Sequence, residues 1–335
     1  MKAVAYTHAR PVDHEDALLD VELPDPVPRH RDILVQVKAV SVNPVDTKLR
    51  RHADPVGEPR VLGFDAAGVV SAIGPEVTLF GVGDAVWYAG SIARPGSDAE
   101  LQLVDERIVG RKPASLSFAE AAALPLTTIT AWEMLFDRLR IPLSPHREST
   151  LLIIGGAGGV GSIAIQLARQ LTGVSVIATA SRPETREWCR SLGAHEVIDH
   201  TADLPAELRR VGVAGAEYIF STNATDLHWK AIAEAVAAQG KIGVIDDPEA
   251  IDVRTLKQKS ASFHWELMFT RPVFATPDMI EQHRLLEAVA QLVEQGRIRT
   301  TLTEHFGRID ARNLRRAHAL IESGRARGKI VLEGF

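Results

Sequence analysis

The second half of the chain alternates short apolar runs with segments of helical periodicity. Leu151–Ile154 is an uninterrupted apolar run, typical of a strand that is buried on both faces. From Val160 to Leu171, apolar residues recur at 3.6-residue spacing, which predicts a helix. The same patterns recur downstream as strands at 174–180, 217–221 and 241–245 and as a helix at 183–192. This alternation predicts an α/β fold with a doubly wound parallel sheet.

The first 125 residues have a different pattern, made of strand-like runs separated by glycines. The runs 33–40, 69–74 and 84–88 carry β-branched residues and partial alternation. They predict a small, irregular β-barrel or sandwich. At Ser117–Glu120, a capping-box pattern precedes an alanine-rich segment and predicts the start of a helix.

The C-terminal segment departs from the alternating pattern. A helix is expected at 277–295, with Thr276 as its cap, Pro277 in its first turn and Gly296 at its C-terminal end. A short strand, a basic helix and a strand at 329–332 follow. We therefore expect three segments: residues 1–125 as the first domain, 126–265 as the parallel-sheet domain, and 266–335 returning to the first domain.

Composition and charge narrow the functional classes. The chain has 335 residues and a formal net charge of −5, which argues against a global attraction to nucleic acid. The basic stretch 308–329 is typical of a solvated helix face. The one cysteine, Cys189, allows no intramolecular disulfide. Without a signal-peptide pattern or an apolar run of about 18 residues, no membrane association is expected, and the protein is expected to be cytoplasmic.

The strongest local signal is the glycine-rich stretch 155–161. It contains G-x-G-x-x-G at Gly156, Gly158 and Gly161, after a buried strand and at the start of an amphipathic helix. Small residues let the backbone approach a pyrophosphate, and the helix N-terminus offers free N–H groups. The residues expected at a bound dinucleotide here are Gly156, Ala157, Gly158, Gly159, Val160 and Gly161. A merely structural glycine turn is the alternative.

The end of the second strand distinguishes between the two nicotinamide cofactors. NAD sites usually have an acidic residue there to hold the ribose 2′-hydroxyl. This chain instead has Ser181 followed by Arg182. A cation at a helix start opposes the helix dipole, and a bound phosphate would offset that cost. The sequence therefore predicts NADPH, although Ser181 could simply cap the helix with Glu184.

These motifs together resemble those of the medium-chain dehydrogenase/reductase superfamily. The stretch 155–169, GGAGGVGSIAIQLAR, follows an N-terminal β domain as in that superfamily. The stretches 43–48, 62–68 and 125–132 are similar to quinone oxidoreductases, and 263–269 resembles a subgroup labelled zinc-type alcohol dehydrogenase-like. The resemblance implies a GroES-like catalytic domain, a Rossmann domain and a C-terminal return to the catalytic domain.

The zinc ligands of the superfamily are missing from the corresponding positions. Zinc-dependent members have Cys where this chain has Asn43, His where it has Phe64, and a further Cys near Leu126 or Thr127. Asp65 alone does not make a zinc site. The structural zinc of the superfamily needs four cysteines in one lobe, which this chain lacks. No metal is therefore expected.

The resemblance also implies which residues lie near the nicotinamide. Asn43 and Asp46 are expected there, although both residue types are ordinary turn formers. Thr127 and Thr130 match positions that approach the nicotinamide ring and ribose, with helix packing as the alternative. Lys48 stands where quinone reductases often have a tyrosine. It could donate a hydrogen bond to the product oxygen, or simply be a solvated lysine.

Further cofactor contacts are expected at the ends of the sheet strands, where ligands bind in doubly wound sheets. Asn223, Gly243 and Ile245 are the candidates by strand position, whereas His200, Arg271 and Lys329 are candidates by resemblance to the family. For His200, a surface histidine without a ligand role is the alternative. His264 and Trp265 are expected in the substrate pocket, with a domain-junction core as the alternative for the tryptophan.

Without zinc, the chemistry that remains is hydride transfer from NADPH to an acceptor that is already electrophilic. Quinones and α,β-unsaturated carbonyls fit, because their conjugation stabilises the product anion. Two alternatives stay open: a zinc-type alcohol dehydrogenase, and a non-catalytic, crystallin-like NADPH-binding protein. A homodimer is expected from the resemblance and from the strand at 240–245, which could lie near a sheet edge.

Overall fold

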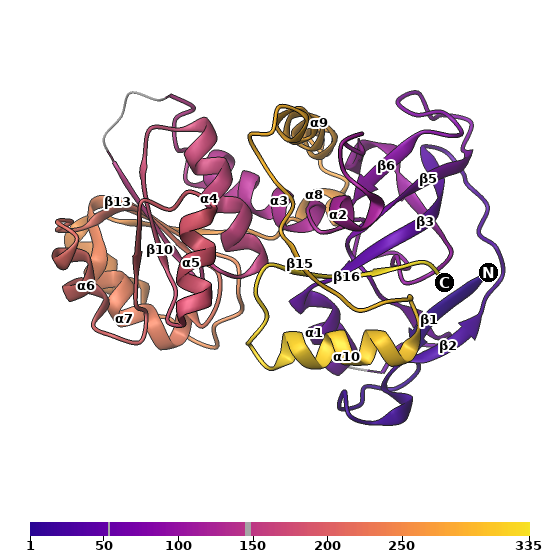
Figure 1. Cartoon of the computed structure of the whole chain (residues 1–335), viewed down its shortest axis with the longest axis horizontal. Helices are drawn as coiled ribbons and strands as arrows, with labels where there is room; N and C mark the ends of the chain where they lie inside the picture. The colour runs from indigo at the N-terminus through magenta and orange to yellow at the C-terminus, as the bar shows by residue number, and fades with distance from the viewer. Residues whose placement is uncertain (53, 145–148) are drawn as a thin grey trace. The chain divides into compact units, whose positions relative to one another are not determined.

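The computed structural model describes residues 1–52, 54–144 and 149–335. The chain forms two compact units, one made of residues 1–129 and 269–335 and the other of residues 130–268. The sequence-based boundaries lay at 125 and 265. The C-terminal segment belongs to the first unit, which is coloured indigo to magenta and yellow in Figure 1.

The first unit is built on a seven-stranded sheet. Its order is β15-β16-β3-β5-β6-β8, and β7 pairs with β3. These strands are β3 (Asp32–Val42), β5 (Ala66–Ile73), β6 (Ala85–Tyr88), β7 (Leu101–Asp105), β8 (Val109–Arg111), β15 (Leu302–His305) and β16 (Lys329–Glu333). Because β16 pairs antiparallel with the end of β3, the last strand of the chain closes this sheet beside residues 39–42.

A smaller sheet of order β2-β1-β4 completes the β structure of this unit. It contains β1 (Lys2–Tyr6), β2 (Leu19–Glu22) and β4 (Arg60–Val61). Short 3₁₀ turns at Glu15–Ala17 and Glu106–Ile108 separate strands. The punctuated β pattern of the first 125 residues thus corresponds to this GroES-like unit.

The helices of the first unit range from 5 to 14 residues. They are α1 (Pro44–His52), α2 (Phe118–Ala122), most of α3 (Pro125–Trp132), α8 (Thr270–Phe274), α9 (Glu281–Glu294) and α10 (Ala311–Glu322). Ser117 and Glu120 form the expected capping box at α2. The helix expected from Pro277 begins only at Glu281, because residues 277–280 form turns instead.

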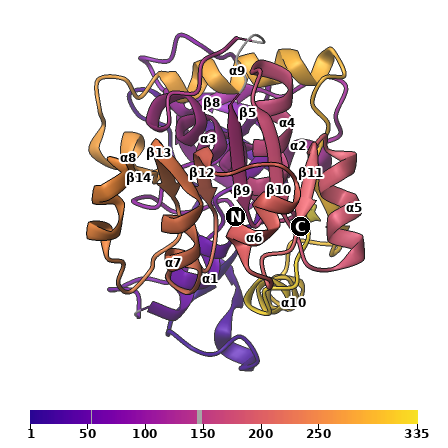
Figure 2. The ribbon, with the colours of Figure 1, turned by 90° about the vertical axis from the view of Figure 1, so that its left-hand side faces the viewer.

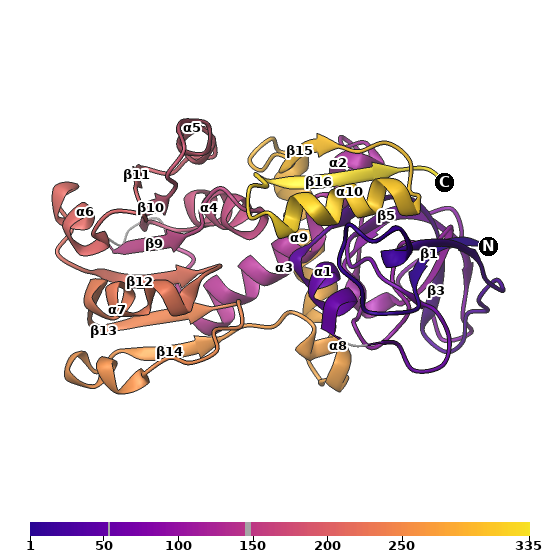
Figure 3. The same ribbon diagram turned by 90° about the horizontal axis from the view of Figure 1, so that it is seen from below.

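A buried cation fixes α1 against α10, which lie side by side in Figures 1 and 3. The Arg50 side chain is completely buried and donates hydrogen bonds to Glu322, to His318 and to the Arg10 carbonyl oxygen. His318 is also fully buried, and burial together with Arg50 lowers its pKa to about 3. A neutral imidazole can therefore accept from Arg50 without adding a second buried positive charge.

The second unit is a six-stranded parallel sheet of order β11-β10-β9-β12-β13-β14, whose strands follow one another in that order in Figures 2 and 3. The strands are β9 (Thr150–Ile154), β10 (Ser175–Thr179), β11 (Glu196–Ile198), β12 (Ala216–Ser221), β13 (Val236–Val244) and β14 (Ser262–Trp265). All their pairings are parallel, which confirms the doubly wound sheet. His264 and Trp265 thus belong to the sixth strand of this sheet.

The crossovers are α4 (Gly159–Leu171), α5 (Pro183–Ser191), α6 (Leu204–Arg210), α7 (Thr225–Ala235) and a 3₁₀ segment, Val253–Lys259. Right-handed crossovers place α4 and α5 on one face and α6 and α7 on the other. The strand order reverses between β9 and β12, so the chain creates a crevice at the carboxyl ends of these two strands.

The strand that was expected near a sheet edge lies next to one. β13 is paired on both sides, with β12 and β14. The exposed edge itself is therefore β14. The strand pattern at 241–245 could not reveal this, because its neighbour β14 contains polar residues and lacks a continuous apolar pattern.

Among the described residues, no helix is both long and apolar enough to cross a lipid bilayer.

Candidate functional site

The glycine-rich loop follows β9 at the point where the strand order reverses. Gly155 has a positive φ of 79°, and a side chain there would collide with Thr222 and Asn223. A Cβ on Gly156 would lie 2.7 Å from Ala178 Cβ and 3.2 Å from Cys189 Sγ. The glycines therefore let the loop pack against β10, α5 and the end of β12.

The loop leaves the N-terminus of α4 without a side-chain cap. Its N-cap is Gly158, and no side chain accepts from the first turn. The Gly155 and Gly156 amides are instead bonded to Thr179 Oγ1 and the Thr179 carbonyl oxygen, both at 3.1 Å. These bonds fix the loop to β10 and leave the start of a 13-residue helix able to receive an anionic group.

The three motif glycines have separable roles, and two substitutions should distinguish them. A Cβ on Gly158 would meet only Gly155 O at 3.5 Å, an ordinary contact. A Cβ on Gly161 would overlap the Gly155 carbonyl and lie 2.7 Å from Gly156 Cα. We expect Gly161→Ala to lower stability by about 1–3 kcal/mol through overpacking, and Gly158→Ala to change it by less than about 0.5 kcal/mol.

A bound pyrophosphate would add a second difference. Gly158→Ala should then weaken NADPH binding by roughly tenfold, because its methyl group occupies space that the ligand needs. Thermal unfolding and NADPH titration of both variants would check this. A Gly158→Ala protein with wild-type stability and wild-type NADPH affinity would contradict a close approach of the ligand to this residue.

Other predicted cofactor residues gather at the same end of the sheet. Asn223 follows β12 and packs against Gly155. Gly243 lies in β13, where any Cβ would collide with Met134, so this glycine is needed for packing. Ile245 follows β13 and is half-buried. Asp246 next to it accepts from the Thr225 amide at 2.9 Å and thus caps α7.

The end of β10 carries the predicted phosphate-binding residues. Ser181 is exposed, and the N-cap of α5 is Arg182, which makes no side-chain cap bond. The capping box of Ser181 with Glu184 does not form. Glu184 instead pairs with Arg182, Oε1 to Nε at 3.2 Å. Arg186 adds a second guanidinium here. It donates to the carbonyl oxygen of Ala180, just after β10, and to that of Val197 in β11.

His200 lies beyond the end of β11, edge-to-face with His228. Its Nδ1 is buried and has no hydrogen-bond partner, and burial and the neighbouring His228 lower its pKa. A neutral imidazole at this end of the sheet is a hydrogen-bonding group that a ligand could use.

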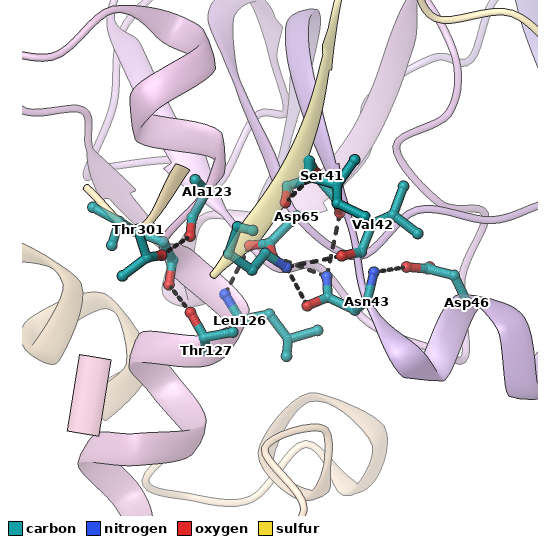
Figure 4. A network of polar contacts seen from close by, with 12 residues as sticks. Ser41, Val42, Asn43, Asp46, Asp65, Ala123, Leu126, Thr127 and Thr301 are labelled. Carbon is teal, nitrogen blue, oxygen red and sulfur yellow. Dashed lines mark hydrogen bonds and ion pairs between the residues drawn. The ribbon is translucent and has the colours of Figure 1, made fainter. Parts of the chain in front are cut away.

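In the first unit, the structure brings Asn43 and Asp65 together around a buried lysine (Figure 4). The Lys329 ammonium donates to Asp65 Oδ2 at 2.9 Å, to the Val42 carbonyl at 3.1 Å and to Asn43 Oδ1. Asn43 Nδ2 in turn donates to Asp65 Oδ2 at 2.9 Å and to the Ser41 carbonyl at 3.2 Å. All these side chains are buried.

This network satisfies its members internally. The three contacts of Lys329 match the three N–H donors of its ammonium, and both N–H groups of the Asn43 amide are used. Both side chains therefore hold the end of β3 in place. Direct contacts of Asn43 with a substrate, or of Lys329 with a cofactor, stay predictions.

Asp65 connects the network to α3. Its second oxygen, Oδ1, accepts from the amide of Leu126 in the first turn of that helix at 2.8 Å. A carboxylate from another segment thus takes the role of a helix N-cap. Thr127 follows in the same turn, and its hydroxyl donates to the Leu124 carbonyl at 3.0 Å. The buried ion pair therefore also sets the position of Thr127.

Asp46 has a capping role at α1. Its Oδ2 accepts from the Asn43 amide at 2.6 Å, and its Oδ1 accepts from the Gly63 amide at 3.2 Å. Burial raises the pKa of Asp46 to about 7, although these bonds and Lys329 oppose the increase. The neighbouring Asp98 is also buried, and burial raises its pKa well above the usual range. A site role of Asp46 beyond capping stays a prediction.

The remaining predicted residues are more exposed or lie elsewhere. Lys48 is exposed on α1, two residues after Asp46. Arg271 is buried on α8 and forms an ion pair with Asp278 at 3.0 Å. Trp265 is 53% exposed on the edge strand, and burial and nearby cations lower the pKa of its neighbour His264. Thr130 is buried at the start of the second unit.

A catalytic zinc does not fit these residues. Phe64 has no ligating atom and packs edge-to-face against Phe269, with ring centroids 5.4 Å apart. Asn43 and Asp65 are occupied by a buried ammonium, whose charge would repel a dication. Among the described residues, no group of three or more His, Cys, Asp or Glu side chains could hold a metal ion.

Sequence reasoning missed the partners of several charged residues. Asp65 is the single charged residue in an apolar stretch, and this pattern signals a buried, paired group, whereas Lys329 ends a basic stretch and carries no such signal. Glu133 and Glu266 are likewise buried in the second unit, and the partly exposed Arg138 pairs with Glu266. Nothing in the local sequence identifies which residues pair, because the partners are more than 120 positions apart.

Comparisons with known proteins agree with this architecture. The chain matches the family described as alcohol dehydrogenase GroES-like domain over residues 29–130 and the one described as zinc-binding dehydrogenase over residues 192–332. It is 44% identical to a zinc-type alcohol dehydrogenase-like protein of Staphylococcus aureus, over 99% of both chains. A crystal structure of a protein from Rhizobium etli CFN 42, named after zinc-dependent alcohol dehydrogenases, superposes on this chain with a TM-score of 0.96. The two sequences are 59% identical, and the match covers 100% of this chain and 98% of the other.

Relatives with other names are more distant. The chloroplastic quinone-oxidoreductase homolog of Spinacia oleracea is 29% identical, covering 95% of this chain and 94% of its own. The 2-methylene-furan-3-one reductase of Solanum lycopersicum is 39% identical over 61% of this chain and 53% of its own. A mycobacterial protein solved in complex with NADPH has a TM-score of 0.85 at 26% identity, covering 99% and 100% of the chains.

Proposed function

Because this chain belongs to the medium-chain dehydrogenase/reductase superfamily, among its zinc-type alcohol dehydrogenase-like proteins, we propose that it is a zinc-independent, NADPH-dependent reductase of quinones or α,β-unsaturated carbonyls. The family makes the chain an oxidoreductase of NAD(P)-dependent type. The observation that carries the finer proposal is the buried ion pair between Asp65 and Lys329. The Lys329 ammonium takes up the oxygens of Asp65 and Asn43, in a site that lacks metal ligands.

The residues of the second unit fit a bound NADPH. The uncapped N-terminus of α4 and the small side chains of 156–161 can hold the pyrophosphate. Arg182, at the end of β10, supplies the positive charge for a 2′-phosphate, and Ser181 adds an exposed hydroxyl. Asn223 and His200 lie at the same edge of the sheet. The mycobacterial relative solved with NADPH supports this choice of cofactor.

When bound, the nicotinamide supplies the hydride, and the protein orients the acceptor and stabilises the charge that develops on its oxygen. An isolated ketone concentrates that charge on one oxygen and normally needs a metal or a strong acid. A conjugated acceptor spreads it, so hydrogen bonds are sufficient. Lys48 is an exposed cation of α1 that could donate one, and the product oxygen then takes its proton from solvent or from this ammonium.

A substrate panel tests the proposal. We expect NADPH oxidation with ortho- or para-quinones or with activated enones, and almost no NADP⁺ reduction with simple primary or secondary alcohols. Chelator treatment should leave the rate unchanged, and elemental analysis should find less than about 0.1 zinc per chain. Efficient alcohol oxidation with no turnover of any quinone or enone would overturn the proposal, and so would stoichiometric zinc that is needed for activity.

Lys48 has its own test in the same assay. If its ammonium acts on the acceptor, Lys48→Met should lower kcat by more than it raises the KM for NADPH, because the lost interaction develops only in the transition state. Lys230→Met, at an exposed position on α7, is the matched control. An unchanged kcat would remove Lys48 from the mechanism and leave quinone reduction intact.

We also propose a homodimer, now through β14. This strand is an edge of the six-stranded sheet, and an exposed edge invites pairing across a two-fold axis. Trp265 at its end and Leu267 just after it are 53% and 54% exposed, which favours burial against a second copy. Sedimentation at micromolar concentration should give a dimer that a proline at Phe263 disrupts. A purely monomeric wild-type protein would contradict the proposal.

A further inference from the structure

The chain crosses between its two units twice, and a buried carboxyl group lies near each crossing on the side of the second unit. The first crossing is at Ile129–Thr130, and Glu133 follows three residues after Thr130. The second is at Met268–Phe269, and Glu266 precedes Met268 by two residues. Both carboxyl side chains belong to the second unit, and they are 1% and 4% exposed.

The segment that carries Glu133 has irregular helical geometry. Residues Glu133–Arg138 form a π-helical turn, with the Leu139 amide bonded to the Met134 carbonyl. Such turns are rare and insert a bulge that re-aims side chains. Here the turn brings Glu133 and Arg138 to the same carboxyl group, that of Glu266 just beyond β14. Arg138 Nε donates to Glu266 Oε2 at 2.6 Å.

The charges of this cluster balance only if it keeps one proton. Among the described residues, the charged or titratable groups that shift the pKa of Glu266 are Glu133 and Arg138. One guanidinium neutralises one carboxylate, and a second buried carboxylate beside it would be uncompensated, which is strongly unfavourable. Two carboxyl groups that share one proton, together with one guanidinium, have no net charge. In agreement, burial and the adjacent Glu133 raise the pKa of Glu266 to about 9.

We propose that Glu133 and Glu266 share one proton, and that this proton clamps together the two connections where they enter the second unit. While the proton is held, the π-helical turn is bonded to the segment after β14. When it is lost, two carboxylates repel each other beside a single arginine, and the two connections loosen. The pair is therefore a proton-dependent device that positions Thr130 on one connection and the 264–268 segment on the other.

The direction of the pH dependence follows from linkage. In the opened state the Glu266 carboxyl group is solvated and loses its proton near pH 4.5, whereas the closed state keeps that proton up to a pKa of about 9. The closed state thus binds one more proton between these values. Its stability relative to the open state is complete below pH 4.5, falls as pH rises, and levels off above about pH 9.

Native-state hydrogen exchange on the full chain tests this inference. Protection factors, which remove the intrinsic pH dependence of exchange, should fall by up to roughly tenfold per unit between about pH 6 and about pH 8 in peptides that cover 130–138 and 262–268. Peptides that cover β9 serve as the internal reference and should not change. In Glu266→Gln the remaining carboxylate pairs with Arg138, no proton is held, and protection should become independent of pH.

A second variant and a control keep the test decisive. Glu133→Gln should also abolish the pH dependence, so it replaces Glu266→Gln if that variant does not fold. Glu234→Gln removes an exposed glutamate of the same unit and should behave as wild type. Infrared spectra at about pH 8 should contain a protonated-carboxyl band that weakens in Glu266→Gln. Protection that is independent of pH in the wild type, or a slope unchanged in both pair variants, would overturn the clamp.

Discussion

Replacing Lys329 with methionine should be among the most damaging single substitutions in the first unit, at about 3–5 kcal/mol of unfolding free energy. The side chain is 3% exposed, and its ammonium donates to Asp65, Asn43 and the Val42 carbonyl. Methionine has a similar volume but no donor. It leaves the Asp65 carboxylate buried with only two hydrogen-bond donors, so Asp65 must take up a proton or open to water.

Chemical denaturation followed by circular dichroism would measure this loss. Lys2→Met, at an exposed position on β1, is the matched control and should change stability by less than about 0.5 kcal/mol. The double variant Lys329→Met with Asp65→Leu should recover part of the loss, since an apolar pair removes the uncompensated charge. A Lys329→Met protein as stable as Lys2→Met would show that the ion pair does not hold β3, β16 and α3 together.

The parts of the fold that follow local rules could be predicted from the sequence. The buried run at 151–154, the 3.6-residue spacing after Val160 and the capping box at Ser117 all correspond to elements of the structure. Each depends on contacts between residues close in sequence. The predicted start of the helix at Pro277 failed because residues after Thr276 satisfy their hydrogen bonds in turns, through bonds such as that from the Met279 amide to the Thr276 carbonyl.

The candidate site depended more on distant contacts. The glycine motif located the loop after β9, because its residues carry their own conformational requirement. The roles of Asn43 and Lys329 could not be predicted in this way. The two residues are 286 positions apart, and each is a hydrogen-bond partner of the other. Likewise, only the strand order reveals that β14 pairs with the outer side of β13. Pairing between remote segments has no signature in a single sequence.

Arg182 remains the residue on which the choice between NADPH and NADH should depend. Its guanidinium is at the N-cap of α5, half-exposed, with Glu184 as a partner 3.2 Å away. An exposed ion pair of this kind contributes little, about 0–1 kcal/mol, so a phosphate can compete for the arginine. A charge-assisted contact to phosphate is stronger, because two negative oxygens can face the guanidinium fork.

Arg182→Ala should therefore raise the KM for NADPH by roughly 10–150-fold, equivalent to about 1.5–3 kcal/mol, and leave the KM for NADH almost unchanged. Glu184→Gln should lower the KM for NADPH or leave it unchanged, since it removes the competing carboxylate.

Arg190→Ala, at an exposed position near the other end of α5, controls for a general change in surface charge. Steady-state kinetics with both cofactors would measure these effects. An equal loss for NADPH and NADH would mean that Arg182 supports the fold of this region and does not read the 2′-phosphate. Because Arg186 is already bonded to the Ala180 and Val197 carbonyls, its geometry gives it a smaller share in that recognition.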